Sequence, residues 1–224
     1  MVYITGDTHG DFSRLDSFKF KKDDILIVLG DACINYSLND DDKKLKEYLK
    51  KYNITIFCIR GNHEERPENI STYKELDMYA GKVFIEDEYP YLVFAKDGEE
   101  YIINGKKILV IGGAYSVDAE YRLINGLEWF KDEQLSEEEM NMIMDKVKDK
   151  EYDLVLTHTC PHKYEPVENF LPSIDQSKVD RTMEYFLDKV EESIRYKKWY
   201  CGHYHTEKKK GNLEFMHESI KEMK

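Results

Sequence analysis

The run VYIT at residues 2–5 ends at GDTHG, residues 6–10, and the same pattern of an apolar run that stops at a polar loop recurs along the chain. The run ILIVL at residues 25–29 ends at Gly30 and Asp31, and TIFCI at 55–59 ends one residue before GNHE at 61–64. Short continuous apolar runs are typical of strands that are buried on both faces. Together with the helical stretches between them, these runs predict a parallel sheet at the start of an α/β fold.

Two later runs end in the same way. LVLT at residues 154–157 ends at His158, and KWYC at 198–201 ends at Gly202, which is followed by His203 and His205. If the backbone stays extended there, the two histidines point to one side and form a metal-ligand pair. For this stretch alone, two loop histidines that face water are an equal alternative. Because sites in open α/β sheets gather outside the carboxyl ends of the strands, the five run ends together indicate one metal site.

The ordered motifs resemble those of the calcineurin-like metallophosphoesterases. The match runs from residue 2 to residue 205 and comprises Asp7-x-His9, Gly30-Asp31, GNHE at 61–64, His158 and Gly202-His203-x-His205. The resemblance implies an α/β fold of two packed mixed β-sheets flanked by helices, a four-layer sandwich. It also implies a dinuclear metal centre between the strand ends, within a single domain that spans residues 1–224.

The resemblance also implies a role for each motif residue. The first metal takes Asp7, His9 and His205, the second takes Asn62, His158 and His203, and Asp31 bridges both. His63 does not bind metal but protonates the leaving oxygen. His162 is an alternative ligand, although His158 follows its strand directly and matches the family position.

Carboxylate, imidazole and amide donors suit Mn, Fe, Co, Ni or Zn better than Ca or Mg. The expected cofactors are therefore two divalent transition-metal ions. Two such ions about 3.5–4 Å apart can clamp a phosphoryl group and activate a bridging hydroxide for attack on phosphorus.

The second motif departs from the protein Ser/Thr phosphatase branch of this family. That branch continues with an aspartate that orients the catalytic histidine and an arginine that grips the phosphate, whereas this chain has Ile34 and Asn35. The partner of His63 therefore stays open. Candidate substrate contacts are Arg66 and Arg122, whose guanidinium groups can fork around a phosphate, and Asn35 as a neutral donor. A plain surface role is the alternative for each arginine.

These residues predict a metal-dependent phosphoesterase, and most directly a phosphomonoesterase (phosphatase). The alternatives are a phosphodiesterase or nuclease with the same centre, and a non-catalytic binding module on this scaffold. The net charge is −12, and 35% of the residues are charged. Such a surface disfavours general binding of nucleic acids, although a metal-dependent nuclease stays open. The expected partner is a phosphate-ester substrate, and no protein partner is predicted.

No run approaches the ~20 apolar residues of a membrane helix, so no membrane association is predicted. A cleaved signal peptide would remove Asp7 and His9, so we expect a cytoplasmic protein with reduced cysteines. The four cysteines show no CxxC spacing and are expected to pack in the core; they are Cys33, Cys58, Cys160 and Cys201.

Other patterns predict the remaining elements. Asn39 is expected to cap a helix, Ser136 to open another with a capping box, and residues 179–194 to form a third. Two turns, DG at 97–98 and NG at 104–105, separate expected strands and mark the crossing into the second sheet. The expected strands are 91–94, 100–103, 107–111 and 213–216, the stretch 12–20 has a roughly helical stripe, and 208–212 is expected to be a basic turn. Residues 116–133 show no clear periodicity and are expected to form a lid or substrate wall, or else an ordered surface loop.

Overall fold

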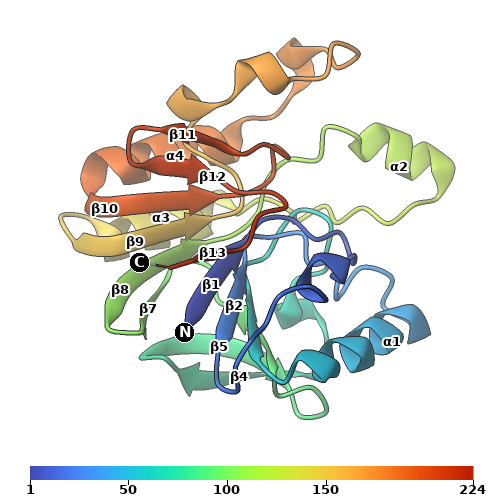
Figure 1. Ribbon diagram of the computed structural model, residues 1–224. Coiled ribbons are helices and arrows are strands. Elements are labelled where there is room, and N and C mark those ends of the chain that lie inside the picture. Colours follow the sequence, from blue (N-terminus) through green and yellow to red (C-terminus); the bar gives the residue numbers. More distant parts are fainter. Residues whose placement is uncertain (224) are drawn as a thin grey trace.

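The computed structural model describes residues 1–223, whose strands form two mixed β-sheets that pack face to face (Figure 1). The first sheet has seven strands in the order β13-β1-β2-β3-β6-β5-β4. Within it, β1, β2, β3 and β6 are parallel, which confirms the parallel sheet expected at the start of the chain. Its strands are β1 Val2–Thr5, β2 Ile25–Val28, β3 Thr55–Cys58, β4 Tyr73–Met78, β5 Gly81–Glu86, β6 Leu92–Ala95 and β13 Lys221–Glu222.

The second sheet has six strands in the order β11-β12-β10-β9-β8-β7. The four central strands are parallel, and the edge strands β7 and β11 run antiparallel to their neighbours. In each sheet the carboxyl ends of the parallel central strands therefore lie at the same edge. The strands are β7 Glu99–Ile103, β8 Lys106–Ile111, β9 Glu151–Thr157, β10 Arg195–Cys201, β11 Lys208–Lys210 and β12 Leu213–Phe215.

The α-helices are α1 Asp40–Leu49, α2 Ala119–Asn125, α3 Glu137–Val147 and α4 Thr182–Ser193. Helix α1 covers the outer face of the first sheet and α3 and α4 cover that of the second, which makes four layers, whereas α2 stands apart from both sheets (Figure 1). Short 3-10 turns cover Ser13–Leu15, Lys50–Tyr52, Pro67–Asn69, His162–Tyr164, Val167–Asn169 and Gln176–Lys178. Two caps form as predicted: the Asn39 side chain accepts the Asp41 N–H, and Ser136 forms a capping box with Glu139.

The period of two along each strand divides the core into three parts. On β1, Val2 and Ile4 face the second sheet, whereas Tyr3 packs on the α1 side with Leu49. The outer face of the second sheet packs against α3 and α4, for example through Val155. The expected four-layer α/β sandwich is thus confirmed, and burial on both faces explains the continuous apolar runs.

Several elements differ from the prediction. The stretch 12–20 forms only the short turn Ser13–Leu15, because its aromatic side chains pack as a cluster over Tyr3 instead of along a helix. The DG turn at 97–98 was expected to be a hairpin turn, but it joins β6 to β7 in different sheets, which confirms the expected crossing into the second sheet. The NG turn at 104–105 does join the antiparallel pair β7 and β8. Residues 208–210 form β11 instead of a basic turn, and residues 221–222 pair with β1.

Candidate metal centre

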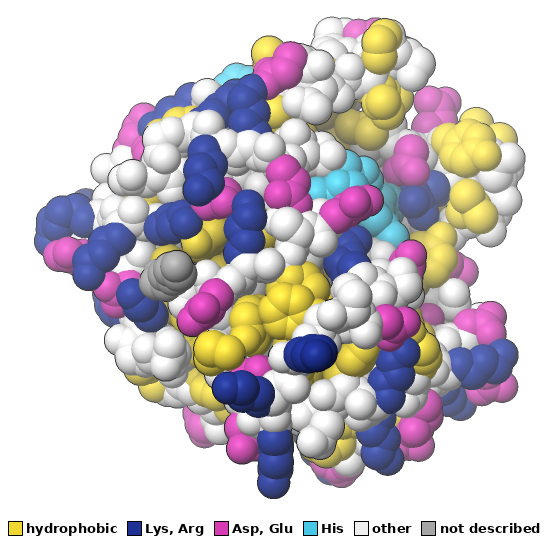
Figure 2. Space-filling model, viewed as in Figure 1, with side chains coloured by type: hydrophobic (Ala, Val, Ile, Leu, Met, Phe, Trp, Pro, Cys, Tyr) yellow, Lys and Arg dark blue, Asp and Glu magenta, His cyan; other side chains and the backbone are white. Residues whose placement is uncertain are grey.

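All seven expected ligands lie where the carboxyl ends of the two sheets meet. Asp7 follows β1, Asp31 follows β2 and Asn62 follows β3, while His158 follows β9 and the 203–205 loop follows β10. Figure 2 shows histidine side chains gathered in a hollow of the surface. Each sheet supplies part of the set, so the cluster forms only when both sheets are packed together.

One group of candidate ligands contains Asp7, His9 and His205. The two Nε2 atoms of the histidines lie 2.9 Å apart, and Nε2 of His205 lies 3.4 Å from Oδ2 of Asp7. Nε2 of His9 lies 3.9 Å from the same oxygen. The three side chains therefore converge on one point, which is the arrangement that a single cation requires.

Asp31 stands between this group and a second one. Its Oδ2 lies 3.9 Å from Nδ1 of His9, and its Oδ1 lies 3.6 Å from Nε2 of His158. Asp7, Asp31 and His158 are also close enough to hold a metal ion together. His203 completes this side, because its ring centroid lies 5.0 Å from that of His158. One carboxylate thus presents an oxygen to each group.

The orientation of His158 is set by the backbone. Its Nδ1 lies 2.8 Å from the carbonyl oxygen of Leu29, which can only accept, so Nδ1 carries the hydrogen. Nε2 then presents a lone pair, and it lies 2.8 Å from Oδ1 of Asn62. Two acceptors at this distance need a shared proton or a shared cation between them. The donor set therefore fits a metal ion at this position.

Asn62 is oriented in turn by side chains that the sequence analysis did not single out. Its Nδ2 donates to Oγ of Ser116 at 2.8 Å, and the Ser116 hydroxyl donates to Oε2 of Glu133 at 2.5 Å. Oδ1 of Asn62 is thereby directed at the cluster. No sequence signal marks Ser116 or Glu133. Both lie in the stretch without periodicity, and Ser116 is 54 residues from Asn62 along the chain.

The loops that carry the ligands need unusual backbone conformations. His203 and His205 have φ angles of 66° and 46°, in the left-handed region, so the expected extended backbone is wrong there. Both side chains still line the cavity, because the turn brings them around. A Cβ on Gly202 would lie 2.2 Å from Oδ1 of Asp7, and one on Gly30 would lie 1.9 Å from Nδ1 of His158. Glycine is needed at both positions for the ligands to approach.

Hydrogen bonds and neighbouring histidines hold the two carboxylates ionised in spite of their burial. Burial alone would raise the pKa of Asp7, but the hydrogen bond from His205, the nearby histidines and the His203 N–H lower it overall. Asp31 behaves alike, since the pKa rise from burial is outweighed by His158, His63 and His9. Burial lowers the pKa of His203 to about 3, so that ring is a neutral donor at neutral pH. Neutral imidazole and ionised carboxylate are the forms that bind metals.

His63 lies beside the cluster, with 15% of its side chain exposed. Its backbone N–H donates to Oδ1 of Asp31 at 2.9 Å, and Nε2 lies 3.9 Å from Oδ2 of the same residue. Burial lowers the pKa of His63, with Asp31 acting in the opposite direction. The nearest guanidinium is that of Arg122, whose Nη2 lies 3.5 Å from Nε2 of His63.

Arg122 is held in this place by three neighbours. Its Nε donates to Asp118 at 2.8 Å, and its Nη1 donates to the hydroxyl of Tyr36 at 3.1 Å and to the carbonyl oxygen of Glu128 at 3.3 Å. These contacts leave Nη2 directed at His63. Of the three expected substrate contacts, Arg122 is the one that the structure brings to the cluster.

Arg66 and Asn35 do not reach the cluster as expected. Arg66 is buried against the stretch before α3, where it donates to the carbonyls of Asp132 and Gln134 and to Glu139. Asn35 is 1% exposed and accepts a hydrogen bond from Tyr73 at 3.0 Å. None of the three expected substrate contacts lines the cavity, but Arg122 alone contacts a residue that does, His63. His162, the alternative ligand, also lies outside the cluster, because its ring packs on Tyr185 and faces Glu165.

A cavity of about 420 Å³ opens beside the cluster. One wall consists of Tyr115 and residues 116–118, the beginning of the stretch 116–133 that was expected to form a lid or substrate wall. The next part of that stretch differs from a plain loop, because residues 119–125 form α2 and expose Leu123 and Ile124. The opposite wall comes from residues 165–184 and Tyr204.

The chain belongs to the calcineurin-like phosphoesterases, whose family model matches residues 1–207. This family works with a dinuclear metal centre, and the two groups of side chains that could hold a metal ion agree with it. The protein is thus a metal-dependent phosphoesterase by family.

Similarity to one curated protein and to one solved structure gives no further information on the activity of this chain. Over 69 residues the chain is 35% identical to the UDP-N-acetylglucosamine–N-acetylmuramyl-(pentapeptide) pyrophosphoryl-undecaprenol N-acetylglucosamine transferase of Clostridium novyi (strain NT). That stretch is 31% of this chain and spans only 17% of the curated relative. The crystal structure of TT1561 of Thermus thermophilus is similar over 96% of this chain and 87% of that one, with a TM-score of 0.48 and 12% identity.

Among residues 1–223, no helix combines the length and the apolar character that crossing a bilayer requires. The four cysteines are free thiols, and three of them are fully buried, in line with the expected packing role. Burial raises the pKa of Cys58 and Cys201, which disfavours their reactive thiolate form.

Proposed function

We propose that this protein hydrolyses phosphomonoesters with two divalent transition-metal ions of the Mn, Fe, Ni, Co or Zn type. Asp7, His9 and His205 would hold one ion, Asn62, His158 and His203 the other, and Asp31 would bind both. The support is the convergence of the first three side chains and the position of Asp31, with one oxygen toward each group. When bound, two such ions neutralise phosphoryl oxygens and lower the pKa of the attacking water.

The chain's own residues supply the remaining chemistry. His63 lies at the edge of the cluster and lines the cavity, where a departing alkoxide would be within its reach. We assign it the role of general acid, which protonates the leaving oxygen through Nε2. Ser116 and Glu133 keep the Asn62 amide oxygen directed at the cluster, so that the donor geometry is set before substrate binds.

The preference for monoesters is carried by one observation, the Arg122 guanidinium beside His63. A monoester dianion needs more positive charge than a diester monoanion. This chain has Asn35 in place of the arginine of the protein-phosphatase branch, and Arg122 supplies a cation from a different element. A guanidinium donates two parallel hydrogen bonds to a phosphate and cannot lose its charge near neutral pH.

The test is turnover on matched mono- and diesters, with Mn, Ni and Mg each added to metal-free protein. We expect the monoester to have the higher kcat/KM. A diester preference of more than about tenfold, or about 1.4 kcal/mol of transition-state free energy, would replace the monoesterase by the diesterase or nuclease. Metal binding without turnover of any ester would instead support a binding module.

We also propose that residues 1–224 act as a single domain. Both sheets contribute ligands, and the inter-sheet core joins strands of the two halves. Neither half could form the centre alone.

A further inference from the structure

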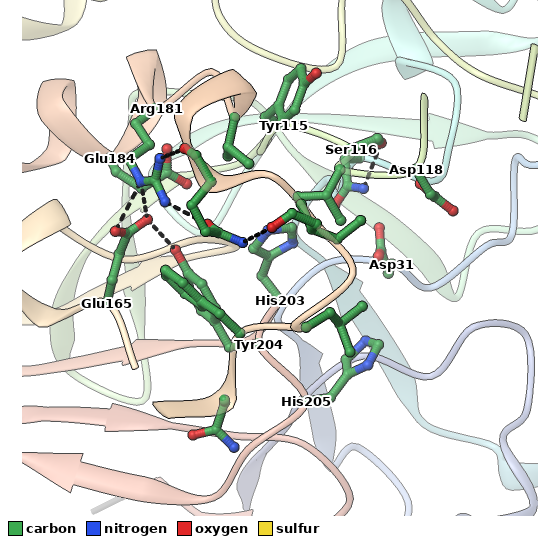
Figure 3. Close-up of a pocket in the computed structure, with 18 of the residues that line it drawn as sticks. Asp31, Tyr115, Ser116, Asp118, Glu165, Arg181, Glu184, His203, Tyr204 and His205 are labelled. Atoms are coloured by element: carbon green, nitrogen blue, oxygen red, sulfur yellow. Dashed lines mark hydrogen bonds and ion pairs between the residues drawn. The ribbon is translucent and has the colours of Figure 1, made fainter. Parts of the chain in front are cut away.

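The cavity is larger than the phosphoryl group needs. Its volume of about 420 Å³ falls within the range of about 300–1,000 Å³ that is typical of sites for small organic molecules. Figure 3 shows Glu165, Arg181 and Glu184 on the side of the pocket away from Asp31, with His203 and Tyr204 between. We call this side, lined by residues 165–184 and Tyr204, the distal subsite.

One wall of the distal subsite is apolar and partly aromatic. The rings of Phe170 and Tyr204 are nearly parallel, at 20°, with centroids 6.3 Å apart. Leu171, Ile174 and Val179 extend the wall, and Leu171 is 60% exposed. An exposed leucine beside stacked rings offers a surface on which a flat apolar group can pack.

The floor of the distal subsite contains an unpaired acid. Glu184 is 3% exposed, and its Oε1 accepts a hydrogen bond from the Thr159 hydroxyl at 2.6 Å. Its Oε2 is buried and has no hydrogen-bond partner among residues 1–223. No other cavity-lining residue in that part of the chain has a buried, unpaired polar side-chain atom. Burial raises the pKa of Glu184 to about 7, so the hydrogen bond from Thr159 offsets only part of the lost hydration of this carboxyl.

The neighbouring arginine does not satisfy this acid. Nε of Arg181 donates to both oxygens of Glu165 at 3.1 Å, and its Nη atoms donate to the backbone and side-chain oxygens of Gln176 at 2.8 and 2.7 Å. Arg181 therefore holds Glu165 and Gln176 together in the cavity wall and makes no hydrogen bond to Glu184. No side chain or backbone group among residues 1–223 donates to Oε2 of Glu184, so this oxygen is available to a donor from a ligand.

We propose that the distal subsite binds the organic part of the substrate, and that this part is a planar heterocycle with N–H donors, as in a nucleotide. The ring packs on Phe170, Leu171 and Tyr204, and an N–H of the ring edge or its amino group donates to Glu184. The position of the substrate's phosphate at the candidate metal centre rests on the proposed function. A plain aryl group would leave Glu184 unpaired, and a polyol would leave the apolar wall uncovered.

Ligand binding can be tested without turnover. Saturation-transfer difference NMR on metal-free protein would use adenosine, which carries no phosphate to hydrolyse. We expect the base protons to receive at least about twice the saturation of the ribose protons. Leu171→Ala and Phe170→Ala should each reduce the base signal at least threefold. Leu123→Ala is the matched control, because Leu123 is 61% exposed but does not line the cavity, and it should change nothing. Absence of a base signal, or equal loss in the Leu123 variant, would overturn the proposal.

Turnover provides a second test that separates this inference from the proposed function. Adenosine 5′-monophosphate and sn-glycerol 3-phosphate both release a primary alcohol, so their leaving groups are alike. We expect kcat/KM to favour the nucleotide at least tenfold, and Leu171→Ala and Glu184→Met to reduce that ratio about fivefold. A ratio near one in the wild type, or one that these variants leave unchanged, contradicts the subsite. If no ester is hydrolysed with any metal, the proposed function fails, and the NMR result alone decides the distal subsite.

Discussion

Nδ1 of His158 lies 2.8 Å from the carbonyl oxygen of Leu29, and this hydrogen bond joins the two sheets at the candidate centre. Leu29 follows β2 in the first sheet, and His158 follows β9 in the second. The bond therefore does two things at once. It fixes the imidazole with Nε2 free to bind metal, and it pairs a buried backbone acceptor at the point where the sheets meet.

We first predict the effect of losing this bond. His158→Ala should lower the free energy of unfolding of the chelated protein by at least about 1–3 kcal/mol, because the Leu29 carbonyl is left unpaired in the core. Denaturant unfolding in chelator measures this loss apart from metal binding. The loaded variant should also bind less metal. His162→Ala is the control, and equal losses of metal in both variants would contradict the assignment of His158.

Asp31→Asn tests the shared carboxylate. The amide keeps the shape but removes the charge that two cations would share, so we expect bound metal to fall and activity to drop by at least a hundredfold. Elemental analysis after metal loading and gel filtration gives the stoichiometry, with two ions per chain expected in the wild type. Asp41→Asn, on the exposed first turn of α1, should match the wild type. Undiminished metal content in Asp31→Asn would refute the shared role.

His63→Ala tests the general acid. Acid catalysis contributes typically 10²–10⁴-fold, so alkyl phosphates with poor leaving groups should slow by about that factor. An aryl phosphate with a good leaving group needs less protonation and should slow much less. Metal content should be unchanged. Equal slowing of both esters, or loss of metal, would show that His63 has another role.

Two arginines provide a matched pair for the phosphate contact. Arg122→Ala should lower kcat/KM for a monoester about tenfold to a hundredfold, the range of one hydrogen bond to a charged group, and should affect a diester less. Arg66→Ala should instead lower the melting temperature, because Arg66 is bound to Glu139 and two backbone carbonyls. If Arg66→Ala shifts the ratio of monoester to diester turnover and Arg122→Ala does not, the two assignments are reversed.

Glu184 should make stability depend on pH in a defined window. Burial raises its pKa to about 7 from an ordinary value of 4.5, so the folded state binds the proton more tightly than the unfolded state. The resulting stability is complete below pH ~4.5 and is lost as pH rises to ~7, by an amount on the order of 3 kcal/mol. Glu184→Gln cannot ionise, and its unfolding free energy should not show this loss. Parallel pH profiles for the two proteins would contradict the pKa rise.

Sequence patterns were sufficient for the features that depend on local structure. A buried strand that ends in a polar loop is visible in the sequence, and the shared sheet edge then places Asp7, Asp31 and His158 together. The contacts that hold these ligands were not predictable, because Ser116 meets Asn62 across 54 residues and has no local pattern.

The two arginines also show that sequence position does not reveal which side chains meet in the folded protein. Arg66 directly follows the GNHE motif, and Arg122 lies far from every motif, so proximity in sequence favoured the former. Burial of Arg66 against the stretch before α3 reverses that order. The helical stripe at 12–20 was misleading for a related reason. Tertiary packing of its aromatic rings outweighed the helical pattern, and only the turn at 13–15 forms.

The contact between His9 and His205 spans 196 positions of the chain. A ribosome adds about 5–20 residues per second, so His9 is made roughly 10–40 s before its partner exists. Until residue 158 is made, the nascent polypeptide carries Asp7, His9 and Asp31 without any of the second-sheet histidines. Residues 221–222, which cover the edge of β1, emerge later still. The full candidate centre can therefore assemble only after residue 205 has been made, and a translation product that stops before residue 203 lacks two of its seven candidate ligands.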